Sequence, residues 1–313
     1  MKNLTELRTS SGSDWLTLAI ESDKEERAKL KAIEQQLLTR YGDYKGIIDN
    51  FDKQPAKSIY LQANGEFTAE KKLLMDFYKW PPAKLKAIFY DLRNKNKMRE
   101  CPYCGNPVRP NTLDHFVPES HWPEFALYPD NLVPQCQQCA SKKSNRYYML
   151  PDKGCFFIHP KFVDELSRLG FKIEMTANSD AIAYTPSINI SGAVTDKLKE
   201  RIKRHITALD IPAYMVAYCQ KQERELLDMI EQANSKKMHF SVQEHCQRQY
   251  NTQRLIAGLS LDENPEFYPN WACAYYYALL ASPVIINDYQ KLLKATRNPP
   301  VTSAAVASSV LFP

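Results

Sequence analysis

Cys101-Pro-Tyr-Cys104-Gly and, 31 residues further on, Cys136-Gln-Gln-Cys139 form the stretch that decides the fold of this chain. The two-residue gap lets both sulfurs of a pair turn toward one ion, and four thiolates favour tetrahedral zinc. All four expected ligands are protein sulfur, so no position remains for a catalytic water and the zinc is predicted to be structural. Such an ion contributes on the order of 10 kcal/mol to the folding of a segment with little core. The alternative, four unrelated buried cysteines, is disfavoured by this spacing.

Two further motifs lie near the cysteines: Thr-Leu-Asp-His-Phe-Val-Pro at 112–118 and Asp-Asn-Leu-Val-Pro at 130–134. Together with the cysteine pairs and the lysine pair 142–143, they resemble the zinc-stapled form of the HNH endonucleases, the ββα-metal superfamily. The resemblance implies a two-stranded hairpin followed by a helix, with a divalent cation between them. It also implies a metal-dependent nuclease.

The resemblance carries roles over to three residues of this chain. His115 matches the general base, which takes a proton from the water that attacks phosphorus, and a neutral imidazole suits that task. Asp114 matches a ligand of the catalytic metal, expected to be Mg²⁺ or Mn²⁺ because these ions prefer oxygen ligands. Asn131 matches the residue whose amide or backbone carbonyl orients the imidazole. A purely structural Asp-His pair and a turn cap at Asn131 are the plain alternatives.

One position departs from the family pattern. The family places a second metal ligand, Asn or His, directly after the last cysteine, where this chain has Ala140. Ser144, one helical turn further along, or Asn145 could reach the ion instead. Contacts to nucleic-acid phosphate are expected from three basic residues that follow the last cysteine: Lys142, Lys143 and Arg146.

The residues before the cysteine pairs, 1–98, have helical patterns. A capping box at Ser22–Glu25 and an apolar stripe from Leu30 to Tyr41 predict one helix of about 18 residues. Thr68 is expected to cap a helix that runs to Trp80. Pro81-Pro82 then breaks this helix and starts a third, whose apolar residues recur at helical spacing and whose opposite face is basic.

The predicted nuclease module spans residues 99–150. The chain after it shows two sequence patterns, one strand-like and one helical. Alternating residues at 155–158, 171–175 and 181–184 predict a small antiparallel sheet. From Thr195 to about Lys294 the helical period returns, so 151–313 is expected to be a small sheet followed by a helical bundle. The predicted fold class is therefore α+β, mostly α, with a central zinc-bearing module between an N-terminal helical region and this C-terminal region.

Composition excludes several other classes of protein. With 313 residues, 44% of them hydrophobic and 25% charged, the chain has the composition of a globular protein. It has only 9 glycines and neither a GxGxxG nor a GxxxxGK[ST] string, which argues against the common nucleotide-binding loops. The longest uncharged apolar stretch, Trp271–Ile286, is too short to cross a bilayer and contains Pro283, so it is expected to be buried helix. No membrane association and a cytoplasmic location are the resulting expectations.

Charge favours a polyanionic partner. The net charge is +5, and ten basic residues against six acidic ones lie between Pro81 and Leu150, around the cysteine pairs. More distantly, Pro123-Glu124-Phe125, Ile158-His159-Pro160 and the flanking helical regions resemble HNH proteins of bacterial anti-phage systems, the Septu type and its retron-associated relatives. That resemblance implies a companion ATPase of the ABC or SMC type and a role in antiviral defence.

Three functions are consistent with these observations. The first is a metal-dependent HNH endonuclease that hydrolyses phosphodiester bonds of DNA or RNA. The alternative is a zinc-stapled module that binds nucleic acid or a partner and whose catalysis is weakened by Ala140. A scaffold for an ATPase is a third, weaker interpretation.

Overall fold

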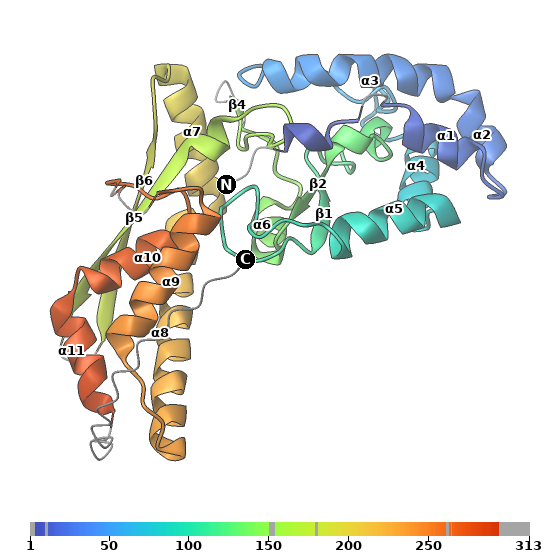
Figure 1. The fold of residues 1–313 in the computed structure, drawn as a ribbon. Coiled ribbons are helices and arrows are strands. Elements are labelled where there is room, and N and C mark those ends of the chain that lie inside the picture. The colour runs from blue at the N-terminus through green and yellow to red at the C-terminus, as the bar shows by residue number, and fades with distance from the viewer. Residues whose placement is uncertain are drawn as a thin grey trace, which may run out of the picture.

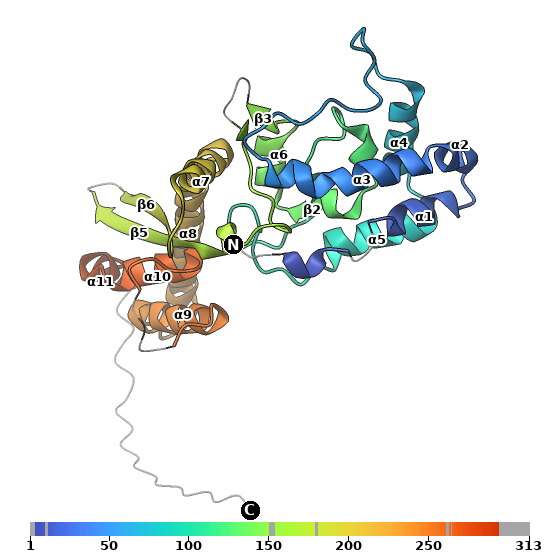
Figure 2. The same cartoon turned by 90° about the horizontal axis from the view of Figure 1, so that it is seen from above.

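The computed structural model describes residues 4–9, 12–149, 154–178, 181–260, 263 and 265–293. The end of the predicted C-terminal region, residues 294–313, lies outside them. The described residues are mostly helical and contain three two-stranded antiparallel sheets. The predicted α+β, mostly α class is thus confirmed. Figures 1 and 2 show two groups of elements: α1–α6 with β1 and β2 form one, and α7–α11 with β5 and β6 form the other.

Among its described residues, the N-terminal part contains a short 3₁₀ turn and five helices: η1 (Thr5–Leu7), α1 (Asp14–Ile20), α2 (Arg27–Ala32), α3 (Glu34–Asp49), α4 (Ala69–Lys79) and α5 (Ala83–Asn94). The helices expected after Thr68 and Pro82 are α4 and α5. The single helix expected up to Tyr41 is instead divided at Ile33, whose φ of −105° and ψ of 3° leave the helical region. The apolar stripe stays buried across this break, because Leu30, Ile33 and Leu37 all enter the core.

The segment between the cysteine pairs forms the expected hairpin and helix. Strand β1 (Thr112–His115) pairs antiparallel with β2 (Leu132–Gln135), so Asp114 faces Val133 and His115 faces Leu132 across the ladder. The loop between them contains two 3₁₀ turns, η2 (Pro123–Phe125) and η3 (Pro129–Asn131). Helix α6 (Gln137–Lys143) begins directly after Cys136, which places two of the four cysteines at its start.

The described residues of the C-terminal part contain two hairpins and five helices. The first hairpin, β3 (Tyr148–Met149) with β4 (Gly154–Cys155), is much shorter than the strand expected at 155–158. The second, β5 (Leu169–Ala177) with β6 (Ile182–Ile190), pairs over nine residues. The helices, preceded by the 3₁₀ turn η4 (Glu165–Arg168), are α7 (Asp196–Leu209), α8 (Ile211–Lys236), α9 (Val242–Ile256), α10 (Trp271–Leu280) and α11 (Pro283–Leu292).

The long hairpin and helix α10 form the core of the C-terminal part. Strand β5 packs against α10, which also contacts α9, while β6 packs against α8 (Figure 1). Trp271 and Tyr275 of α10 are almost fully buried. The apolar stretch that contains them is helical as expected, although it is split between α10 and α11. Within the described residues, no helix combines the length and hydropathy that a membrane span needs.

Candidate functional site

The four cysteines of the two CxxC pairs form one buried cluster. Their Sγ atoms all lie within 4.8 Å of one another, and the Cys101–Cys139 and Cys104–Cys136 sulfurs are each 3.9 Å apart. A tetrahedral ion with Zn–S bonds near 2.3 Å requires sulfurs about 3.8 Å apart. The cluster therefore fits a structural zinc. It is also the one group of three or more His, Cys, Asp or Glu side chains in the described part of the chain that could hold a metal.

A buried histidine joins this cluster to the C-terminal helices. His205 of α7 accepts a hydrogen bond from the backbone N–H of Ile158 (3.1 Å), and its Nε2 lies 2.7 Å from the carbonyl oxygen of Tyr103, between Cys101 and Cys104. Its ring also lies parallel to that of Tyr103. Since Nδ1 accepts, Nε2 must donate, so this arrangement requires a neutral imidazole. Burial lowers the pKa of His205 to about 4.

This pKa predicts acid sensitivity. The unfolded chain takes up a proton on His205 near the ordinary pKa of 6.5, whereas the folded chain takes it up only near 4. Stability contributed by the neutral ring is therefore lost as the pH falls from 6.5 to 4, by on the order of 3 kcal/mol. We expect His205→Gln to reduce the difference between the unfolding free energies measured in urea at pH 7 and pH 4.5. The exposed His239 supplies the control, and an equal reduction in His239→Gln would contradict the assignment.

Asp114 and His115 lie at the end of β1, where Lys143 of α6 reaches both. The Nζ atom of Lys143 lies 2.8 Å from Asp114 Oδ2 and donates a hydrogen bond to the carbonyl oxygen of His115 at 2.7 Å. Lys143 is fully buried, so its ammonium ties α6 to β1 and faces no solvent. The sequence predicted a direct contact between Lys143 and a phosphate. In this arrangement Lys143 is not placed to make that contact. Burial raises the pKa of Asp114 although Lys143 opposes the shift.

The imidazole of His115 is held on three sides. Its Nδ1 lies 3.1 Å from a carboxylate oxygen of Glu119, and its Nε2 lies 3.0 Å from the carbonyl oxygen of Ala126. The ring of Tyr78, from α4, packs edge-on against it with 4.3 Å between centroids. Only 4% of the side chain is exposed. Burial alone would raise the pKa of Glu119, but the hydrogen bond and charge of His115 outweigh burial and lower it to about 2.

Asn131 closes the long loop of the hairpin and makes no hydrogen bond to the imidazole among the described residues. Its Oδ1 accepts hydrogen bonds from the backbone N–H of Val117 (2.7 Å) and the Tyr44 hydroxyl (2.8 Å), and its Nδ2 donates to the carbonyls of Val117 and Phe125. The carbonyl that meets His115 belongs to Ala126, next to Phe125. Asn131 therefore supports His115 through the loop that it holds and through its backbone carbonyl, which accepts a hydrogen bond from the N–H of Phe116 at 2.7 Å.

The other polar residues proposed from the sequence lie apart from Asp114. Ser144 ends α6 with φ of 45° and is exposed, as is Asn145. The Nζ of Lys142 lies 3.2 Å from an Asp210 carboxylate oxygen, and Arg146 donates to the carbonyl of Ala208 at 2.7 Å. Lys142 and Arg146 thus link α6 to the junction of α7 and α8.

Sequence reasoning missed three neighbours of His115. Glu119 lies four residues after His115 in the sequence, and an acidic residue so close to the expected base could have been recognised as a neighbour of the imidazole. Tyr78 and the Ala126 carbonyl carry no such signal, because one comes from a separate helix and the other is a backbone atom inside a long loop. The partly exposed Glu119 shares its surroundings with Asp114, His115 and Lys143, so the four form one charged cluster.

Comparison with known proteins agrees with this geometry. Residues 101–146 match the family model described as HNH endonuclease, a span that contains the hairpin, α6 and all four cysteines. Protein ea31 of Escherichia phage lambda is 34% identical over 77 residues. That match covers 25% of this chain and 25% of the phage protein. No solved structure matches significantly. The segment is thus an HNH module of the zinc-stapled form, which supports a nuclease-type function.

Proposed function

We propose that the chain is an endonuclease that hydrolyses phosphodiester bonds of DNA or RNA, with His115 as general base and Asp114 as ligand of the catalytic metal. One observation carries the proposal: the Asp-His pair of the HNH module ends β1 against α6, with its imidazole fixed by Glu119 and Ala126. Positioned imidazoles of this kind accelerate proton transfer from an attacking water. Nothing in the module selects bases, so the polymer that is cut is left to the binding surfaces around it.

The two ring contacts indicate which nitrogen of His115 accepts the proton. The Glu119 carboxylate and the Ala126 carbonyl are both hydrogen-bond acceptors, so both are satisfied only when Nδ1 and Nε2 each carry a hydrogen. A general base needs one ring nitrogen with a free lone pair. The carbonyl of Ala126 is buried backbone, but Glu119 is a partly exposed side chain. We infer that an incoming phosphate repels the Glu119 carboxylate and frees Nδ1, while Nε2 keeps its hydrogen bond to Ala126.

Asp114 is the residue that would hold a catalytic divalent ion. One carboxylate is a sufficient protein ligand for Mg²⁺ when waters and substrate phosphate complete the shell. Asp114 Oδ2 is buried against Lys143, whereas the side chain as a whole is 19% exposed. Bound there, Mg²⁺ or Mn²⁺ would stabilise charge on the phosphate and the departing oxygen. Since Ala140 removes the family's second ligand, we expect weak binding of the ion.

An engineered ligand tests this expectation. Ala140 precedes Lys143 by three residues, so both lie on the face of α6 that meets β1. We expect Ala140→Asn to lower the Mn²⁺ concentration needed for half-maximal cleavage by about tenfold, the smaller end of the effect of one supporting group on metal affinity. A Mn²⁺ titration of the initial rate measures it. The control is Ser141→Asn on the exposed side, and an unchanged titration for Ala140→Asn would contradict the placement.

The direct test of the proposal uses supercoiled DNA and total RNA incubated with the purified chain in Mn²⁺. Cutting of either polymer that is lost in His115→Ala supports the nuclease. A second candidate is a zinc-stapled binding module, favoured by Ala140 and by the two acceptors that already occupy the imidazole. Binding without cutting, for every divalent ion tried, would favour that module. The companion ATPase and the defence role stay predictions of the wider resemblance.

A further inference from the structure

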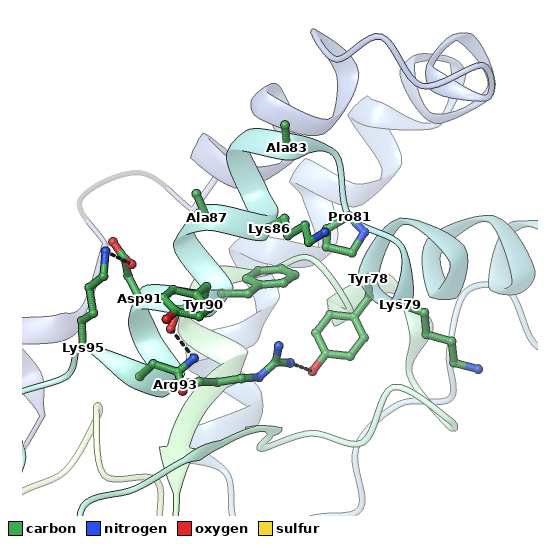
Figure 3. Close-up of a pocket in the computed structure, with 12 residues that line it drawn as sticks. Tyr78, Lys79, Pro81, Ala83, Lys86, Ala87, Tyr90, Asp91, Arg93 and Lys95 are labelled. Carbon is green, nitrogen blue, oxygen red and sulfur yellow. Dashed lines mark hydrogen bonds and ion pairs between the residues drawn. The ribbon is translucent and has the colours of Figure 1, made fainter.

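A groove between α4 and α5 lies outside the HNH module and is lined in part by Tyr78, the residue whose ring packs against the imidazole of His115. It is about 670 Å³ in volume, and Figure 3 shows its charged and aromatic lining. We name it the α4–α5 groove. The lining residues used below are Tyr78, Lys79, Lys86, Tyr90, Arg93 and Lys95.

Tyr78 is the residue that joins the groove to the site. Tyr78 lines the groove, and its ring also packs against His115 with 4.3 Å between centroids. Its hydroxyl donates to the carbonyl oxygen of Leu113 on β1 at 3.3 Å and accepts from Arg93 at 3.4 Å. A phosphate bound at Arg93 would therefore lie one tyrosine away from the imidazole that acts as base.

The charge of the groove is positive and largely uncompensated. Lys95 is paired with Asp91 at 2.8 Å, the one acidic residue of the lining. Lys79 and Lys86 are exposed and have no ion-pair partner within the part of the chain that the structure describes. Among those residues, the Arg93 guanidinium hydrogen-bonds only to the neutral Tyr78 hydroxyl. Three cations are thus available to neutralise phosphates.

Aromatic rings lie beside these cations. Tyr90 in the groove is 55% exposed, and Trp80, next to Lys79, is 74% exposed. Exposed rings that alternate with cations suit a single strand of nucleic acid, because only unpaired bases offer a face for stacking. A duplex would meet the cations but would keep its bases away from the rings.

We propose that the α4–α5 groove binds a single strand of nucleic acid and guides it to His115, so that the water activated by this base attacks a phosphate of the strand. This rests on the proposed nuclease function for the cutting step but not for the binding step. The substrate class is then a nucleic acid with an unpaired segment next to the cut. Lys79, Lys86 and Arg93 would hold its phosphates, and Tyr90 would stack on one base.

Binding can be measured separately from cutting in the full chain carrying His115→Ala. The probes are a fluorescein-labelled single-stranded 20-mer, as DNA and as RNA, and a duplex of the same sequence, followed by fluorescence anisotropy. We expect Lys79→Glu with Lys86→Glu to weaken single-strand binding by at least about tenfold and to flatten its salt dependence. We expect Tyr90→Ala to weaken it by about fivefold or more and to leave the duplex nearly unchanged.

Lys84 provides a matched control. It is exposed on the same helix as Lys86, two residues away and therefore on another face, outside the groove lining. Lys84→Glu makes the same charge change, so an equal loss for Lys84→Glu and Lys86→Glu would overturn the proposal. Unchanged binding in the groove variants would overturn it too and would point to a protein partner for this surface.

Cleavage by the parent chain separates this proposal from the nuclease proposal. Groove-dependent binding without any cutting would refute only the nuclease. Cutting of single strands that ignores Lys79→Glu, Lys86→Glu and Tyr90→Ala would refute only the groove. Circular dichroism checks that the exposed substitutions leave the fold intact.

Discussion

Replacing Cys136 by serine is expected to release the zinc and unfold the segment from residue 101 to 146. A structural zinc on four thiolates contributes on the order of 10 kcal/mol, more than the whole net stability of many domains. Cys136 contributes to the cluster in two ways. Its sulfur lies 3.9 Å from that of Cys104, and its backbone N–H donates a hydrogen bond to the sulfur of Cys101. Zinc content per chain and thermal unfolding by circular dichroism measure the effect.

The comparison variant is Cys246→Ser. Cys246 is fully buried in α9 and outside the cluster, so this change costs core packing but leaves the ion in place. A Cys136→Ser protein that keeps one zinc per chain would show that the ligand assignment is wrong. Loss of cutting should accompany loss of zinc, because β2 runs directly into Cys136 and supports the strand that carries His115.

Replacing His115 by alanine is expected to reduce cleavage by about a hundredfold to ten-thousandfold, the range associated with a positioned acid or base. The ring is 4% exposed and held by Glu119, Ala126 and Tyr78, so alanine removes both the proton acceptor and the contacts that position it. Initial rates on whichever polymer the parent cuts measure the effect.

His121 is the matched control for His115. It lies in the same loop, is exposed, and its ring contacts only that of Trp122 among the described residues. His121→Ala should cut at the parental rate. A His115→Ala protein that folds normally and cuts within twofold of the parent would refute the base assignment, and a further base such as Glu119 would then have to be sought.

The predictions that the structure reproduced are those that rest on short-range chemistry. The helix expected after Pro82 is α5, because its apolar spacing and the proline that precedes it both act within one turn. The prediction of one helix up to Tyr41 was wrong, since the apolar stripe that suggested it continues across the break at Ile33. A stripe records which side is buried and not whether the backbone is continuous.

The same distinction holds at the site. The phosphate contact expected of Lys143 came from its charge and its position after the last cysteine, whereas the structure buries its ammonium against Asp114. Charge alone does not say which way a helix turns a side chain. Asn131 likewise sits beside the site, but its hydrogen bonds close the loop and leave the imidazole to the Ala126 carbonyl.

The sequence by itself determined the zinc-stapled module, because two CxxC pairs and the Asp-His motif specify ligands and strand within a few dozen residues. Tertiary structure decided what surrounds His115: Glu119, the Ala126 carbonyl, Tyr78 of α4 and Lys143 of α6. It also packed Tyr78, which lines the α4–α5 groove, against that ring. Metal ligation and strand pairing depend on local spacing, whereas these contacts depend on how separate helices pack, and packing is fixed only when the whole core forms.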